Sequence, residues 1–330
     1  MKNLFISLLF LLISGCLFIN VEAQQKTAAS NKTNRTFEAE QSPELQKLLN
    51  DSVSQTINAF SSVILKPEQV SATLIDLRDA KNLKIASVRG EEKIYPASVV
   101  KMFYMVALEN WLEDGKVKNT PEVERGLRDM IVVSSNEATQ YILDVLTETS
   151  SGSELPPKEF EKWAYKRNAV NRYFNSLGYQ NINVNQKTFC EDAYGIEQQF
   201  RGYKGENRNM LTTNATARLL TEIVLGRAAT FERTTIMMNL LKRDFSGTTS
   251  DNDDQAHGFS SIALIKRNMT DAKLWSKAGW TSKARHDAAY IETPDGLKFV
   301  LVVFTENAAN ERDIIPMIAG KILDNLGKIK

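Results

Sequence analysis

A serine and a lysine stand three residues apart at the start of an apolar stretch. The segment 95–101 reads YPASVVK. Pro96 fits just before a helix start, so Ser98 is expected in the first turn and Lys101 one turn later on the same face. A serine hydroxyl needs a nearby base, and apolar neighbours lower the pKa of a lysine so that its neutral amine accepts a proton. The spacing predicts Ser98 as nucleophile, Lys101 as base and the Ser98 N–H as an oxyanion donor.

The alternative for this segment is an ordinary helix cap followed by a surface lysine. Residues 98–112 are apolar on nearly every side, however, which is typical of a buried helix. Because an unpaired buried amine is costly, the apolar setting favours the chemical interpretation.

A second polar triplet, Ser134-Ser135-Asn136, follows an apolar run and precedes a predicted helix. The Ser134 hydroxyl could relay a proton to a leaving amine, and the Asn136 amide could bind a substrate carbonyl and Lys101. The competing interpretation is an N-cap, since serine and asparagine are both favoured there.

A third segment, 277–281, reads KAGWT and closes a predicted strand. Lys277 would supply positive charge near an anionic substrate group, Gly279 would allow close backbone approach, and the Trp280 N–H could be the second oxyanion donor. Taken alone, the segment favours another interpretation, an edge lysine followed by a turn.

The strands expected from the sequence lie towards both ends of the chain, and a block of helices lies between them. The expected strands are 70–77, 83–88, 272–277, 288–293 and 297–304, with a hairpin turn at 294–296. The expected helices are 44–60, 98–112, 123–131, 138–146, 160–177, 217–224, 234–241 and 313–326. A long polar loop at 185–210 and a polar insertion at 246–258 interrupt them.

This order predicts an α/β (α+β) fold, in which one antiparallel sheet is flanked by helices and accompanied by an all-helical lobe. The sheet lobe is expected at 44–97 and 227–330, and the helical lobe at 98–226. A groove between the lobes would hold the three polar segments.

The N-terminal segment is interpreted as a targeting signal. Residues 1–23 combine a lysine, an apolar run and a small-residue cleavage site at Ala23, which indicates a secretory signal peptide. The stretch before Cys16 also fits a bacterial lipobox with a lipid anchor on that cysteine. The apolar residues after Cys16 favour cleavage at Ala23. Residues 24–43 are polar and predict a disordered tether.

Composition excludes several other functions. The formal net charge of +1 gives no sign of a nucleic-acid surface, and no second stretch is apolar enough for a transmembrane helix. His257 and His286 are the only histidines, so a three-histidine zinc site is impossible, and His286 is expected in the turn after Lys277. The G-x-S-x-G motif, which forms the nucleophile elbow of α/β-hydrolases, does not occur in the sequence. Cys190 is expected to be a partly buried free thiol.

Together, S-x-x-K, S-x-N and K-x-G occur in the order found in class A β-lactamases and penicillin-binding proteins. Over roughly residues 44–328 the chain resembles class A β-lactamase-like serine hydrolases. The resemblance implies a β-lactamase/transpeptidase-like fold and acylation of Ser98 by a β-lactam or by a D-Ala-D-Ala-type peptide. It implies catalytic roles for Ser98, Lys101 and Ser134 and substrate binding by the following residues: Asn136, Lys277, Gly279, Trp280 and Thr281.

The chain departs from the family pattern in four places. Ser135 replaces the usual aspartate, and Ala278 replaces the hydroxyl residue that helps to hold the substrate carboxylate, a part that Thr281 or Ser282 could take. The stretch between Ser98 and Ser134 is shorter than is typical. The family's Glu-x-x-x-Asn, whose glutamate activates the deacylating water, is absent between 185 and 212. Glu191 is the best positional match for that glutamate, ahead of Glu197 and Glu206.

The sequence therefore predicts a serine β-lactamase-like hydrolase of cyclic amides. A D-Ala-D-Ala-type peptidase and a non-catalytic cell-wall-binding module of the same fold stay open. The expected partner is a small-molecule β-lactam or a peptidoglycan peptide, with no cofactor, metal or nucleic acid. The protein is expected to be a periplasmic or secreted monomer.

Overall fold

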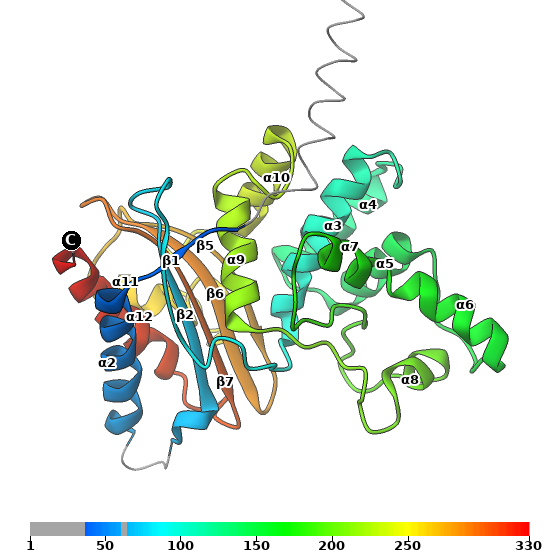
Figure 1. The fold of residues 1–330 in the computed structure, drawn as a ribbon, viewed down its shortest axis with the longest axis horizontal. Coiled ribbons are helices and arrows are strands. Elements are labelled where there is room, and N and C mark those ends of the chain that lie inside the picture. The colour runs from blue at the N-terminus through cyan, green and yellow to red at the C-terminus, as the bar shows by residue number, and fades with distance from the viewer. Residues whose placement is uncertain (1–36, 61–64, 330) are drawn as a thin grey trace, which may run out of the picture.

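The computed structural model describes residues 37–60 and 65–329. Within these residues, seven strands form one sheet in the order β1-β3-β2-β7-β6-β5-β4, and helices cover both of its faces (Figure 1). The strands are β1 (Glu40–Gln41), β2 (Val70–Asp76), β3 (Lys84–Val88), β4 (Lys242–Arg243), β5 (Lys273–Trp280), β6 (Ala284–Glu292) and β7 (Lys298–Glu306). Among these described strands, only the short pairing of β1 with β3 is parallel. The predicted antiparallel sheet flanked by helices is confirmed.

The helices divide between the sheet and a separate lobe (Figure 1). On one sheet face lie α2 (Pro43–Ala59), α11 (Ser261–Ile265) and α12 (Ile314–Asn325). The lobe on the other side contains α3 (Lys101–Glu113), α4 (Pro121–Ile131), α5 (Asn136–Thr147), α6 (Pro157–Arg167), α7 (Ala169–Ser176) and α8 (Ile196–Arg201). Between this lobe and the sheet lie α9 (Thr213–Val224) and α10 (Phe231–Leu241). Three short 3₁₀ turns complete the elements of the described residues: η1 (Pro67–Gln69), η2 (Ala97–Val100) and η3 (Leu326–Lys328).

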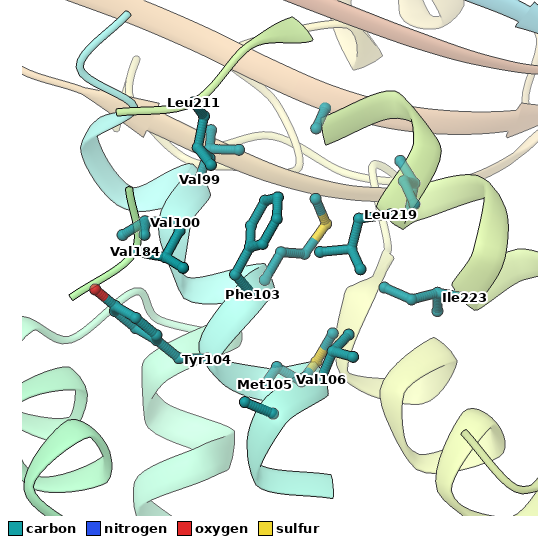
Figure 2. Packing of buried hydrophobic residues seen from close by; sticks show 14 of the residues in the cluster. Val99, Val100, Phe103, Tyr104, Met105, Val106, Val184, Leu211, Leu219 and Ile223 are labelled. Carbon is teal, nitrogen blue, oxygen red and sulfur yellow. The ribbon is translucent and has the colours of Figure 1, made fainter. Parts of the chain in front are cut away.

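Helix α3 forms the centre of the core that joins the two lobes. Each residue from Lys101 through Asn110 is buried. Phe103 and Val106 lie on the side of α3 that faces Leu219 and Ile223 of α9 (Figure 2). The sequence predicted a helix buried all round, and the structure confirms it. Because α3 is rigidly packed, the two catalytic candidates at its start are held in place.

Several boundaries differ from the sequence prediction. The expected helix 160–177 is split at Asn168, whose side chain donates to the Ala164 carbonyl and ends α6. The polar loop 185–210 contains the short helix α8. The expected tether 24–43 ends earlier, since Glu40 and Gln41 pair with β3. Residues 1–36, including the predicted signal peptide, lie outside the described residues.

Two further differences concern the placement of α9 and the length of β5. The sequence assigned α9 to the helical lobe, but Thr213 and Asn214 at its start contact the Thr73 hydroxyl of β2, so that α9 packs on the sheet. Strand β5 continues past Lys277 to Trp280, because Gly279 and Trp280 pair with β6. The K-x-G segment is therefore part of a strand, and the turn begins only after it.

Candidate active site

Ser98 lies half-buried in η2, which runs directly into α3. The preceding residue, Ala97, has a φ of 47°, a left-handed conformation that is strained for a residue with a Cβ. A contact from outside the segment supports this conformation, because His286 Nε2 lies 2.9 Å from the Tyr95 carbonyl oxygen. As the second residue of η2, Ser98 has no acceptor for its N–H inside its own helix, so this donor is available at the site.

His286 was predicted in a turn, but it lies within β6 and is fully buried. Its Nδ1 accepts the Thr305 N–H at 3.1 Å, so its proton sits on Nε2 and is donated to Tyr95. Burial lowers the pKa of His286 to about 4, although its backbone hydrogen bonds oppose the shift. It is therefore a neutral buried support for the segment that precedes Ser98.

Gly279 brings β5 against the nucleophile segment. A Cβ at this position would lie 2.7 Å from the Ser98 nitrogen, 2.9 Å from the Val99 nitrogen and 3.0 Å from the Pro96 oxygen. Since real Cβ atoms do not approach so closely, any side chain would push the strand away from the start of the helix. The close approach that the sequence assigned to Gly279 is therefore required by the packing.

Trp280 follows with its side chain half-exposed. Successive N–H groups of a strand point to opposite edges, and the Thr281 N–H bonds to the Ala284 carbonyl across the turn to β6. The Trp280 N–H therefore points away from β6, to the edge where Ala278 N–H also points. Its direction fits the predicted oxyanion donor. The Thr281 hydroxyl accepts the N–H groups of Lys283 and Ala284, which ties it to the turn.

Lys101 is fully buried and has three oxygen partners. Its Nζ lies 2.5 Å from the Ser134 carbonyl, 3.2 Å from the Ser134 hydroxyl and 2.8 Å from Asn136 Oδ1. Burial lowers the pKa of Lys101 to about 7, and the charges of Glu137 and Cys190 offset part of the effect. The amine is thus able to exchange a proton near neutral pH. Within the described residues, no hydrogen bond joins it to Ser98 Oγ.

Lys277 approaches the same hydroxyl from the sheet. Its Nζ lies 2.9 Å from Ser134 Oγ, 2.7 Å from Gln255 Oε1 and 2.8 Å from the Ala278 carbonyl. Burial lowers its pKa well below the ordinary value, and the charges of Lys101 and Arg243 lower it further. The Ser134 hydroxyl therefore stands between two buried amines that come from different lobes.

Within the triplet 134–136, one residue caps helix α5 and the other two contact Lys101. Ser135 Oγ accepts the Ala138 N–H at 3.0 Å and is the N-cap of α5. Ser134 has a φ of 59° and, together with Asn136, faces Lys101 instead. Ser135 thus provides the N-cap, whereas Ser134 and Asn136 contact Lys101, and their chemical roles stay a prediction. Serine in place of aspartate keeps the cap.

The side chain of Ala278 lies among the buried residues on the opposite sheet face from Lys277. It packs there because successive side chains of a strand alternate between faces. The Cα partner of Ala278 on β6 is Asp287, a buried carboxyl whose pKa is raised by burial.

The polar loop places its acidic residues in unlike surroundings. Glu191 is exposed and borders a small pocket with Tyr95 and Arg208. Glu197 is buried and pairs with Arg167 at 2.8 Å and Lys187 at 3.2 Å, which anchors the loop to the helical lobe. The structure does not bring Glu191 into hydrogen-bond contact with Lys101 or Ser134.

Cys190 lies in the same loop and is exposed, not partly buried as expected. Its sulfur lies 3.5 Å from Asn136 Nδ2 and 4.0 Å from Glu137 Oε1. The loop thus meets the Ser134–Asn136 turn through its thiol.

The sequence analysis did not identify Gln255, which contacts Lys277 from the polar insertion. A lone glutamine among polar residues carries no motif. Across residues 37–60 and 65–329, no group of three or more His, Cys, Asp or Glu side chains is arranged to hold a metal ion. No helix in the same residues combines the length and apolar character needed to cross a membrane.

The sequence matches a family model described as "Beta-lactamase enzyme family" over residues 112–326. This range includes Ser134, Asn136 and Lys277 and begins after Ser98 and Lys101. No curated protein sequence matches the chain.

Among solved structures, the fold is similar to a beta-lactamase from Sphaerobacter thermophilus, with 20% identity and a TM-score of 0.59, covering 85% of this chain and 98% of that one. It is similar to PBP-A, with 18% identity and a TM-score of 0.58 over 89% and 100% of the two chains. It is also similar to a class A beta-lactamase from Bacteroides cellulosilyticus, with 15% identity and a TM-score of 0.58 over 85% and 99%. At these identities the likeness concerns the fold.

Proposed function

Because the chain belongs to the beta-lactamase enzyme family, we propose that it is a serine hydrolase that opens a β-lactam ring through an acyl-enzyme at Ser98. The observation that carries the proposal is the Ser134 hydroxyl between two buried amines, 3.2 Å from Lys101 Nζ and 2.9 Å from Lys277 Nζ. Two lysines brought to one hydroxyl at the cost of burial are hard to explain as structural support.

In the proposed acylation, Ser98 Oγ attacks the lactam carbonyl carbon and its proton passes to the neutral amine of Lys101. The N–H groups of Ser98 and Trp280 hold the oxyanion that forms. The ring nitrogen leaves with a proton from the Ser134 hydroxyl. That hydroxyl is then reprotonated by the ammonium of Lys101, so that protons balance over the step.

Recognition is proposed to use residues of both lobes. Lys277 attracts the substrate carboxylate, and Asn136 offers its amide to the acyl side chain. Gly279 on β5 and Thr281 in the turn after it are proposed to contact the substrate as well. Ala278 contributes no hydroxyl, so carboxylate recognition depends more on Lys277 than the family pattern implies.

Hydrolysis of the acyl-enzyme requires a carboxylate that takes a proton from water. Glu191 is proposed for this part as the best positional match on the loop. A D-Ala-D-Ala-type peptidase is the second candidate, because within the described residues no carboxylate forms a hydrogen bond with Lys101. A protein without such a base acylates and then turns over slowly.

The proposal is tested by incubation with a fluorescent penicillin, followed by intact mass at several times. A transient adduct that is absent in Ser98→Ala supports a β-lactamase, and a stable adduct supports the peptidase or a cell-wall-binding module. Labelling that survives Ser98→Ala, or that moves to Cys190, contradicts the nucleophile assignment. No adduct at all contradicts β-lactam acylation and directs the search to another substrate.

The proposed location follows from the chemistry and the N-terminal segment. Residues 1–23 are proposed to direct export, with Cys16 as a lipid anchor if cleavage occurs before it. A monomer in the periplasm or outside the cell would meet both β-lactams and peptidoglycan peptides.

A further inference from the structure

We propose that Gln255 is a positioning residue that joins Lys277 to the turn carrying Ser134 and keeps the charge of Lys277 available to an anionic substrate. The inference rests on the proposed function, since it concerns how the same site recognises a substrate carboxylate. Gln255 lies in the segment 246–258, which carries no family motif.

The side-chain amide of Gln255 bridges the two lobes. Its Oε1 accepts from Lys277 Nζ at 2.7 Å and from the Ala278 N–H at 3.2 Å. Its Nε2 donates to the carbonyls of Ile131 at 3.2 Å and Val132 at 2.9 Å. The first pair belongs to β5, and the second pair ends α4 just before Ser134. One side chain thus sets the spacing between the amine and the hydroxyl.

Only one orientation of this amide satisfies its surroundings. The oxygen faces two donors and the NH₂ group faces two carbonyl acceptors. A flipped amide would place donors against the Lys277 amine and an oxygen against carbonyls, which leaves buried groups unpaired. The contacts therefore require an uncharged side chain with both an acceptor and a donor, at the length of glutamine.

The loop around Gln255 is tied down on both sides. Before it, Asp253 pairs with the buried Arg285 at 2.6 Å. After it, Arg285 donates to the Gly258 carbonyl at 2.6 Å, and the Ser260 N–H donates to Asp287 at 3.1 Å. Because β6 anchors the backbone in this way, the amide of Gln255 approaches Lys277 from a fixed base.

The charge balance explains why a neutral residue belongs here. All three acceptors of Lys277 are uncharged oxygens: Ser134 Oγ, Gln255 Oε1 and the Ala278 carbonyl. The other charged groups acting on it are Lys101 from α3, Arg243 from β4 and Asp287 from β6. A carboxylate at position 255 would neutralise the ammonium locally and repel a substrate carboxylate. The neutral amide of Gln255 binds the Lys277 amine without neutralising its charge, so that this charge can attract an anionic ligand.

The test compares the full-length protein with Gln255→Glu, which keeps the length and adds a charge, and with Gln255→Met, which keeps the length and removes the acceptor. Lys277 is titrated by NMR of labelled lysine, with its signal assigned by its loss in Lys277→Arg. Gln255→Glu is expected to raise the pKa of Lys277, and Gln255→Met to lower it. Opposite shifts are not expected from a purely structural glutamine.

Acylation provides the second measurement. In Gln255→Glu, the rate with a carboxylate-bearing β-lactam is expected to fall about ten- to a hundredfold more than the rate with a neutral ester of the same compound, the size of one charge at several Å. Gln46→Glu is the matched control, because Gln46 also bridges backbone groups, here the N–H and carbonyl of Ser87 on β3. Strands β2, β7 and β6 separate β3 from β5.

The outcomes separate this inference from the proposed function. An unchanged Lys277 pKa in both variants, or equal losses with anionic and neutral substrates, overturns the role of Gln255. If the parent forms no adduct, the proposed function fails, and the NMR titration alone decides whether Gln255 positions Lys277. If Gln255→Glu does not fold, the shift in Gln255→Met decides in the same way.

Discussion

Lys101 should set the pH dependence of acylation. Its amine is fully buried, and burial lowers its pKa to about 7. Acylation by a fluorescent penicillin is therefore expected to rise with pH as the amine loses its proton, with a midpoint near the pKa of Lys101. Below this midpoint the amine is an ammonium and cannot take the proton of Ser98.

The size of the effect follows from the shift. At pH 7 about half of the Lys101 side chains carry a neutral amine, against roughly 4 in 10,000 for a lysine with an ordinary pKa of about 10.4. Burial thus raises the amount of base about 10³-fold. Lys101→Arg keeps a cation that is not deprotonated, so its acylation rate should fall by about 10² to 10⁴.

A second variant moves the midpoint without touching the lysine. The charge of Glu137 raises the pKa of Lys101, so Glu137→Gln should shift the midpoint to lower pH. Glu159→Gln is the matched control, because Glu159 is also an exposed glutamate in the first turn of a helix, here α6. Rates are measured between pH 5.5 and 9 by gel fluorescence. A parent rate independent of pH, or equal midpoints in all three proteins, would refute Lys101 as the base.

Three other predictions concern the remaining groups. Lys277→Ala should slow acylation most for carboxylate-bearing substrates, and the difference should shrink as salt rises; equal losses with neutral esters would make Lys277 structural. Glu191→Gln should slow deacylation about 10²- to 10⁴-fold and let the Ser98 adduct accumulate, whereas equal decay in variant and parent would mean that Glu191 is only a surface carboxylate. Burial lowers the pKa of His286 from 6.5 to about 4. Between these two pH values the histidine is protonated in the unfolded chain but neutral in the folded protein. The free energy of unfolding should therefore drop by up to about 3 kcal/mol as pH falls from about 6.5 to 4, and urea titrations of His286→Gln should lack this slope.

The order of the short motifs was enough to predict the fold class, while the roles that it assigns to the site residues stay predictions. Ser98 and Lys101 are one turn apart on a helix whose apolar sequence predicts burial, so their proximity is a local property. The strands were predictable from apolar runs and the turn at 294–296. The split at Asn168 and the extra length of β5 were not predicted. The split depends on one side-chain hydrogen bond to the Ala164 carbonyl, and the extension depends on backbone pairing with β6; the spacing of apolar residues records neither.

The sequence by itself determined which chemical groups this protein carries and that Lys101 sits in an apolar helix. Only the tertiary structure decided that Ser134 Oγ contacts both Lys101 and Lys277. Residues 134 and 277 lie on different lobes, and no local pattern records how two lobes meet. Gln255 shows the same limit, because its partners are a lysine and three backbone groups from two distant segments. Every residue has the same backbone groups, so the sequence does not indicate which of them a side chain will contact. Only the folded structure shows these contacts.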